Sequence, residues 1–181
     1  MEMRVLAFGA SNHSVSINAA FARFAAERFK AEHVQDAVLE ELDLNDFEMP
    51  IYSIDRERDG GIPTQARSFF DRIGSCDRLI ISYPEYNGSY PSAWKNIHDW
   101  VSRIDAKIYQ DKPSIALSAT PGPRAGAGIL GAVEASAPFF GMDLRGVVGV
   151  GKWGEAFDAS SQRLTNPTDD TALNLALSDL I

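Results

Sequence analysis

Residues 4–18 read RVLAFGASNHSVSIN, an apolar run followed by small and polar residues and then by the start of a second apolar pattern. The run over residues 4–9 is almost continuously apolar, which is typical of a parallel strand that is covered on both faces. From Ile17 to Phe29 apolar side chains recur at helical spacing, and Ser16 stands before them as a candidate N-cap. This stretch predicts a strand, a polar loop and a helix in immediate succession.

The same alternation continues to the end of the sequence. Four further apolar runs predict strands, at residues 37–44, 77–84, 113–120 and 143–151. Four further segments predict helices, at residues 64–76, 92–104, 126–141 and 168–181. Five strands that alternate with five helices predict a doubly wound α/β fold, because each parallel connection needs a crossover. Ligands of such folds bind at the carboxyl ends of the strands.

Length and charge narrow the possible partners. With 181 residues and no linker-like tract or internal repeat, we expect one domain over residues 1–181. The 17 Lys and Arg residues against 25 Asp and Glu give a formal net charge of -8, which argues against nucleic acid or an anionic membrane as a partner. A phosphate-bearing cofactor remains compatible with this charge if backbone N–H groups hold it.

The content of cysteine and histidine argues against a disulfide framework or a metal site. Cys76 is the only cysteine, so no intramolecular disulfide can form, and we expect it to be an inert core thiol. The histidines have no companion ligands at metal spacing, and no metal is expected. The apolar run near the N-terminus is too short for a signal sequence or a membrane span, so we expect a cytoplasmic protein.

The loop after the first strand is rich in hydroxyl and amide groups and runs directly into a helix N-terminus. Unpaired N–H groups and the helix dipole favour a phosphate at such a place, and Ser11, Ser16 and Asn18 can add side-chain donors. A polar loop with a capped helix and no ligand is the alternative. The loop lacks the spacing of a P-loop or of GxGxxG.

Two later loops are equally unusual. Residues 84–91, PEYNGSYP, form a stiff loop whose backbone could bond the edge of a flat heterocycle while an aromatic side chain packs nearby. Residues 118–126, SATPGPRAG, follow the fourth strand and offer small residues and a close backbone approach. The carboxyl ends of three strands therefore carry the candidate site.

Residues 84–100, PEYNGSYPSAWKNIHDW, resemble the signature of the NADPH-dependent FMN reductases of flavodoxin-like fold, which include quinone, azo and chromate reductases. The serines of the first loop stand at the offsets of that family's phosphate loop. The resemblance implies a three-layer sandwich around a five-stranded parallel sheet of order 2-1-3-4-5. It also implies a homodimer or homotetramer that acts on a small-molecule electron acceptor.

The resemblance implies bound FMN, with NADPH or NADH as the hydride donor and no catalytic side chain, because the chemistry takes place on the flavin. The first loop would hold the phosphate, the second would wrap the isoalloxazine ring, and the third would flank its other side. The residues concerned are Ser11, His13, Ser16, Ile17, Asn18, Pro84, Glu85, Tyr86, Asn87, Gly88, Ser118, Thr120 and Gly122.

The sequence departs from the family pattern in the first and third of these loops. His13 stands where the family has an arginine and Ala10 where it has a glycine, which predicts weaker hold on the phosphate at neutral pH. Pro121 and Pro123 replace residues that tend to be glycine, and Arg124 is either a partner for the NADPH phosphate or an ordinary loop arginine. An electron carrier, or a family member that has lost FMN, are the alternative functions.

Overall fold

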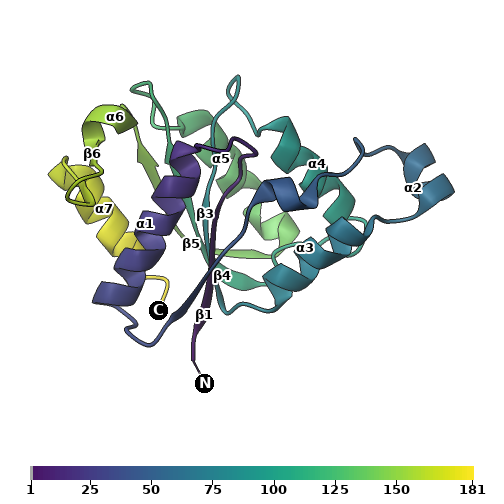
Figure 1. Cartoon of the computed structure of the whole chain (residues 1–181), viewed down its shortest axis with the longest axis horizontal. Helices are drawn as coiled ribbons and strands as arrows, with labels where there is room; N and C mark the ends of the chain where they lie inside the picture. The colour runs from purple at the N-terminus through teal and green to yellow at the C-terminus, as the bar shows by residue number, and fades with distance from the viewer. Residues whose placement is uncertain (1) are drawn as a thin grey trace.

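A computed structural model of the protein describes residues 2–181 and centres on one five-stranded sheet of order β2-β1-β3-β4-β5 (Figure 1). Its strands are β1 (Arg4–Gly9), β2 (Val38–Glu41), β3 (Arg78–Ser82), β4 (Lys112–Ala119) and β5 (Met142–Val150). All four pairings are parallel, with β1 between β2 and β3. The predicted α/β class and strand order are confirmed.

Helices cover both faces of the sheet, as Figure 1 shows. One face packs against α1 (Ile17–Glu32) and α7 (Pro167–Ser178), and the other against α3 (Thr64–Gly74), α4 (Ser92–Val101) and α5 (Ala127–Ser136). Successive side chains of β1 alternate between two buried clusters, which explains why the strand is apolar at nearly every position.

Several short elements of residues 2–181 were not predicted. They are η1 (Leu44–Phe47), α2 (Ile54–Gly60), α6 (Trp153–Ala156) and the hairpin of β6 (Phe157–Asp158) with β7 (Arg163–Leu164). The five predicted helices correspond to α1 (Ile17–Glu32), α3 (Thr64–Gly74), α4 (Ser92–Val101), α5 (Ala127–Ser136) and α7 (Pro167–Ser178), and these shorter elements come in addition. The predicted strand over residues 37–44 is also shorter, because Asp43 accepts the N–H of Asn45 and caps η1.

The predicted helix over residues 126–141 is interrupted. Helix α5 ends at Ser136, and a tighter turn, η2 (Ala137–Phe140), follows it. Pro138 has no N–H to continue the α-helical hydrogen bonds, and Gly141 then adopts a left-handed conformation with φ of 64°. No helix of residues 2–181 is long and apolar enough to cross a membrane.

Candidate functional site

The loops after β1, β3 and β4 meet at the carboxyl edge of the sheet, where Asn18 joins them. The Asn18 side chain, 2% exposed, accepts hydrogen bonds from Ser82 Oγ at 2.7 Å and from Ala119 N at 2.9 Å, and its Nδ2 donates to Ala119 O at 3.0 Å. Three separate segments are thus held together by one buried amide. Asn18, predicted as a phosphate donor, has its side chain engaged mainly with this framework.

The start of α1 approaches the end of β1 closely. A Cβ atom on Gly9 would lie 2.5 Å from Ala19 N, so only glycine permits this contact. Ser16 Oγ accepts the N–H of Ala19 at 3.2 Å and caps the helix as predicted. The close approach directs the first turn of α1 toward the neighbouring loops.

The first loop is shaped by its own polar side chains. Ser11 Oγ accepts the N–H of His13 at 3.2 Å, and His13 Nδ1 accepts the N–H of Val15 at 3.0 Å. Within residues 2–181, the backbone N–H groups of Ser16, Ile17 and Asn18 have no hydrogen-bond partner. Free N–H groups at the start of a 16-residue helix are the feature expected of an anion-binding loop.

One cavity of about 260 Å³ opens between the three loops. Most of the predicted site residues line it: Ser11, His13, Ser16, Ile17, Asn18, Pro84, Glu85, Tyr86 and Thr120. Val15, Ala119 and Pro121 complete the lining. The structure therefore brings together residues that are more than 100 positions apart in the chain.

Asn87 and Gly88, also predicted, do not line this cavity but form the turn beside it. Tyr86 N donates to Ser89 O at 3.0 Å and Ser89 N to Tyr86 O at 3.1 Å. The φ angles of Asn87 and Gly88 are 53° and 76°, which is typical of a type I′ turn and explains the Asn-Gly pair. The turn leaves Tyr86 about half exposed, at 47%.

Ser118 and Gly122, the remaining predicted residues, support the third loop from outside the cavity. Ser118 is buried, and its Oγ donates to Tyr83 O at 2.7 Å. Thr120 Oγ1 donates to Gly122 O at 2.9 Å, which folds the loop back on itself. Gly126 has a φ of 69°, and a Cβ there would lie 2.1 Å from Ser118 Oγ.

The signature helix α4 contributes to a neighbouring segment that sequence reasoning missed. We call residues 49–60 the arm; its α2 end projects from the body of the molecule (Figure 1). Asn96 Oδ1 accepts the N–H of Tyr52 at 2.8 Å, and Trp100 Nε1 donates to Pro50 O at 2.7 Å. Two residues of the signature therefore hold the arm.

The arm adds a second cavity of about 250 Å³ beside the first loop. Asn12 lines it, whereas its chain neighbours Ser11 and His13 line the first cavity. Met49 and Ile51 form part of its apolar wall, and Ile51 is 75% exposed. No periodic pattern in the sequence predicts this wall, because contacts with α4, such as those of Asn96, hold it in place.

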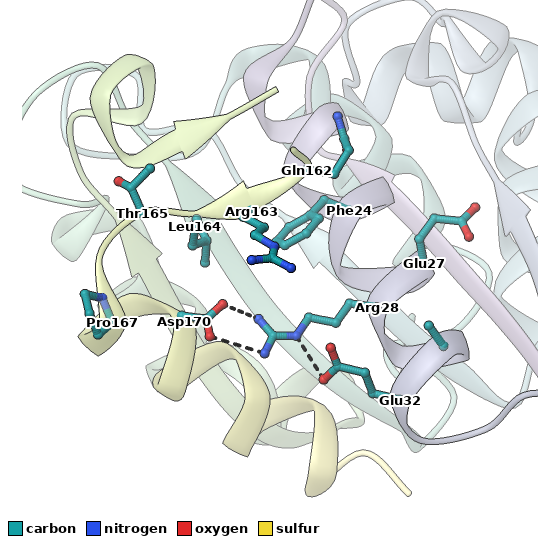
Figure 2. A pocket seen from close by; sticks show the side chains of 11 residues that line it. Phe24, Glu27, Arg28, Glu32, Gln162, Arg163, Leu164, Thr165, Pro167 and Asp170 are labelled. Carbon is teal, nitrogen blue, oxygen red and sulfur yellow. Dashed lines mark hydrogen bonds and ion pairs between the residues drawn. The ribbon is translucent and has the colours of Figure 1, made fainter. Parts of the chain in front are cut away.

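A larger hollow lies elsewhere, between α1, β7 and the start of α7, and measures about 690 Å³ (Figure 2). None of the predicted site residues lines it. Arg28 crosses it and pairs with Asp170 at 2.5 Å and Glu32 at 3.2 Å, as the dashed lines in Figure 2 show. We interpret this ion-pair network as the contact that joins α1 to α7, and size alone does not make the hollow a site.

Comparison with known proteins identifies the class. The sequence model of NADPH-dependent FMN reductases matches residues 3–153, and the chain belongs to this family. The resemblance drawn from residues 84–100 is thereby confirmed. Members of such a family would have a use for three loops that bring free N–H groups next to a tyrosine in one cavity.

Individual relatives match only part of the chain. It is similar to a quinone reductase of Escherichia coli K12, with 31% identity over 80 residues, or 44% of this chain and 43% of that protein. A 2-hydroxy-1,4-benzoquinone reductase of a Burkholderia species is 37% identical over 75 residues, which span 41% and 40% of the two chains. The matched segment thus spans less than half the length of each of these relatives.

Solved structures match over nearly the whole chain. The flavoenzyme NAD(P)H:(acceptor) oxidoreductase FerB of Paracoccus denitrificans superposes with a TM-score of 0.73 at 22% identity, covering 98% of this chain and 95% of that one. An azoreductase of Bacillus anthracis gives 0.60 at 16% identity, covering 98% and 96%. At these identities the likeness establishes the fold.

Proposed function

We propose that this protein binds FMN in the cavity between its three loops and passes electrons from NADPH or NADH to a small acceptor. One observation carries the proposal: the free N–H groups of Ser16, Ile17 and Asn18 begin a long helix and line the same cavity as Tyr86. The phosphate of FMN would bind at the start of the helix, and its flat ring would pack beside Tyr86.

In this proposal each loop has its own task. The first loop would hold the phosphate through its N–H groups, with Ser11, Ser16 and His13 beside them. Residues 84–88 would wrap the isoalloxazine ring, and residues 118–122 would flank it. The fit of FMN to this cavity rests on N–H donors that have no partner in the protein. The negative charge of Glu85 is bound to the N–H groups of α5 and would not face the phosphate.

When bound, the flavin supplies the redox chemistry, since it can accept a hydride from a reduced nicotinamide and later reduce an acceptor. The protein would hold the flavin ring so that first the nicotinamide and then the acceptor can stack on it at one open face of the cavity. Exposed Val15, Tyr86 and Pro121 surround the mouth of the cavity and would form that face. Arg124 is exposed on the same loop as Pro121 and is available to an NADPH phosphate.

Quinones are the acceptor class that we favour, because the relatives named above include reductases of quinones. Azo compounds, chromate and free flavin remain acceptors to be tested. A cytoplasmic location belongs to the same proposal and agrees with a single buried, reduced cysteine.

We also propose that two copies pair through the side of α4 and α5. Phe139 in η2 is 77% exposed, and a cavity of about 190 Å³ lined by Tyr90, Trp94 and Phe140 lies beside it. An exposed aromatic ring next to an apolar cavity suits a two-fold interface, in which each surface meets its own copy. Sedimentation of the purified protein tests this pairing, and a monomer at all concentrations would contradict it.

Steady-state kinetics test the proposed activity. The rate of NADPH oxidation is measured with FMN present at several fixed concentrations of 1,4-benzoquinone, against a blank of free FMN without protein. Because one face must serve both substrates in turn, we expect parallel double-reciprocal lines. Oxidation no faster than the blank would contradict the activity, and intersecting lines would contradict the two-step route.

A further inference from the structure

Helix α5 begins without a cap of its own. Its N-cap residue, Gly126, has no side chain to accept a hydrogen bond, although the first N–H groups of any helix need partners. Glu85 supplies them from the loop after β3: its Oε2 accepts the N–H of Gly128 at 2.8 Å and of Ile129 at 3.0 Å. These are the second and third residues of α5, the positions that a capping side chain normally serves.

The contact is close enough to restrict the residue types on both sides. A Cβ atom on Gly128 would lie 3.0 Å from Glu85 Oε2 and 3.1 Å from Gly88 O. The backbone conformation does not explain the glycine at this position, because the φ of Gly128 is not positive. Glycine is favoured at 128 because the turn over residues 85–88 packs directly on the first turn of α5.

Two ties therefore hold the loop of residues 84–89. Ser118 Oγ binds Tyr83 O just before the loop, and the carboxylate of Glu85 binds α5 within it. Pro84 to Tyr86 form one wall of the predicted cofactor cavity, and Ala119 to Pro121, which lead toward α5, form another. Glu85 thus ties the first of these walls to α5, the helix that follows the second wall in the chain, through one charge-assisted contact.

We propose that Glu85 is a positioning residue that fixes the width of the cofactor cavity by clamping the 84–89 loop to α5. The inference rests on the proposed function, because it assigns the width to FMN. In this role Glu85 transfers no proton, and its carboxylate makes no contact with the flavin ring. The alternative, a direct contact between the carboxylate and the cofactor, gives a different response to a neutral replacement.

The test compares Glu85→Ala, Glu85→Gln and Gly128→Ala with the control Glu134→Ala, an exposed acid on the same helix. FMN dissociation constants are measured by quenching of flavin fluorescence, and the visible circular dichroism of the bound flavin is recorded at saturation. Hydrogen exchange at residues 126–130 is measured on the proteins without FMN, so that the clamp is tested independently of cofactor binding.

We expect Glu85→Ala to weaken FMN binding by about tenfold, because two helix N–H groups lose their partner. It should also change the flavin dichroism and speed exchange at Gly128 and Ile129. Glu85→Gln keeps an acceptor oxygen and should bind FMN within about threefold of the parent, and Glu134→Ala should match the parent. Gly128→Ala should weaken binding as Glu85→Ala does, because its Cβ displaces the same contact.

Two results would overturn the inference. Unchanged exchange at residues 126–130 in Glu85→Ala would show that the clamp does not operate. A Glu85→Gln protein with parental exchange but binding as weak as Glu85→Ala would show that the charge acts on the cofactor itself. If the parent fails to bind FMN, the proposed function fails, whereas faster exchange in Glu85→Ala would still support the clamp.

Discussion

At the scale of single residues, His13 is where the first loop differs most from the family pattern. Its Nδ1 is occupied by the N–H of Val15, so Nε2 is the ring atom left to meet a phosphate. An arginine at this position would add a permanent positive charge and several N–H donors. His13 should therefore hold a phosphate less tightly than an arginine would.

We expect His13→Arg to bind FMN about fivefold more tightly than the parent, because it adds a permanent charge and further N–H donors beside the phosphate. His33→Arg, at the opposite end of α1, should leave the affinity unchanged. Fluorescence titration with FMN measures the effect. Equal affinities of the parent and His13→Arg would contradict a place for residue 13 beside the phosphate.

His98 is half-buried on α4, where its ring packs edge-on against Phe140 with centroids 4.3 Å apart. Burial and the nearby charge of Lys95 together lower the pKa of His98 to about 4, although Asp99 opposes them. Between pH 4 and 6.5 the unfolded chain binds this proton and the folded protein does not. The free energy of unfolding contributed by His98 is therefore present above pH 6.5 and is lost as the pH falls toward 4.

The expected loss over this window is up to about 3 kcal/mol. His98→Phe removes the titration and keeps an aromatic ring against Phe140, so its urea stability should decline less than that of the parent between pH 6.5 and 4. Carboxylates that titrate in the same window affect both proteins alike. Parallel declines in the two proteins would show that the His98 imidazole is not the cause.

At the scale of elements, α4 does more than cover the sheet. Asn96 accepts the N–H of Tyr52 and donates to Met49 O at 3.0 Å and Pro50 O at 3.2 Å, so one amide fixes the base of the arm. A carboxylate cannot replace this amide, because it has no N–H to donate and would place an oxygen next to the two carbonyl oxygens. The arm should therefore depend on the amide group of Asn96 in particular.

We expect Asn96→Asp to lower the free energy of unfolding by about 1–3 kcal/mol, because the N–H donors to Met49 O and Pro50 O are lost. Gln65→Glu, an amide-to-acid change on the exposed side of α3, serves as the control and should have little effect. Urea unfolding gives the readout. A free energy of unfolding equal to that of the parent would contradict the role of the Asn96 amide.

The long elements could be predicted from the sequence because each carries its own periodic pattern and its own end signals. Ser16 caps α1, and the apolar runs of the five strands mark the sheet. The arm could not be predicted, because distant partners determine it, whereas α6 and the β6–β7 hairpin are too short to carry a periodic pattern. Asn96 and Trp100 fix the arm from more than 40 residues away.

The site was predictable at the level of loops and less so at the level of individual roles. Topology brings the ends of β1, β3 and β4 to one edge, so most residues chosen from the sequence line one cavity. The tasks of Asn18 as a framework clamp and Glu85 as a helix cap depend on partners 101 and 43 residues away. No local pattern records contacts at that distance.

At the scale of the whole molecule, the charge of -8 and the proposed phosphate ligand act against each other. A few N–H groups at the start of α1 can offset this repulsion, because they act on the phosphate at short range. One domain over residues 1–181 stays a prediction. The electron carrier and the protein that has lost FMN remain the alternatives.

A visible spectrum tests the central claim most directly. The purified protein is mixed with FMN, desalted and then treated with NADPH without oxygen, and free FMN carried through the same steps is the control. We predict a flavin band that stays with the protein and bleaches when NADPH is added. A colourless protein after desalting would contradict FMN binding, and a retained band that NADPH leaves unchanged would contradict the reductase in favour of the electron carrier.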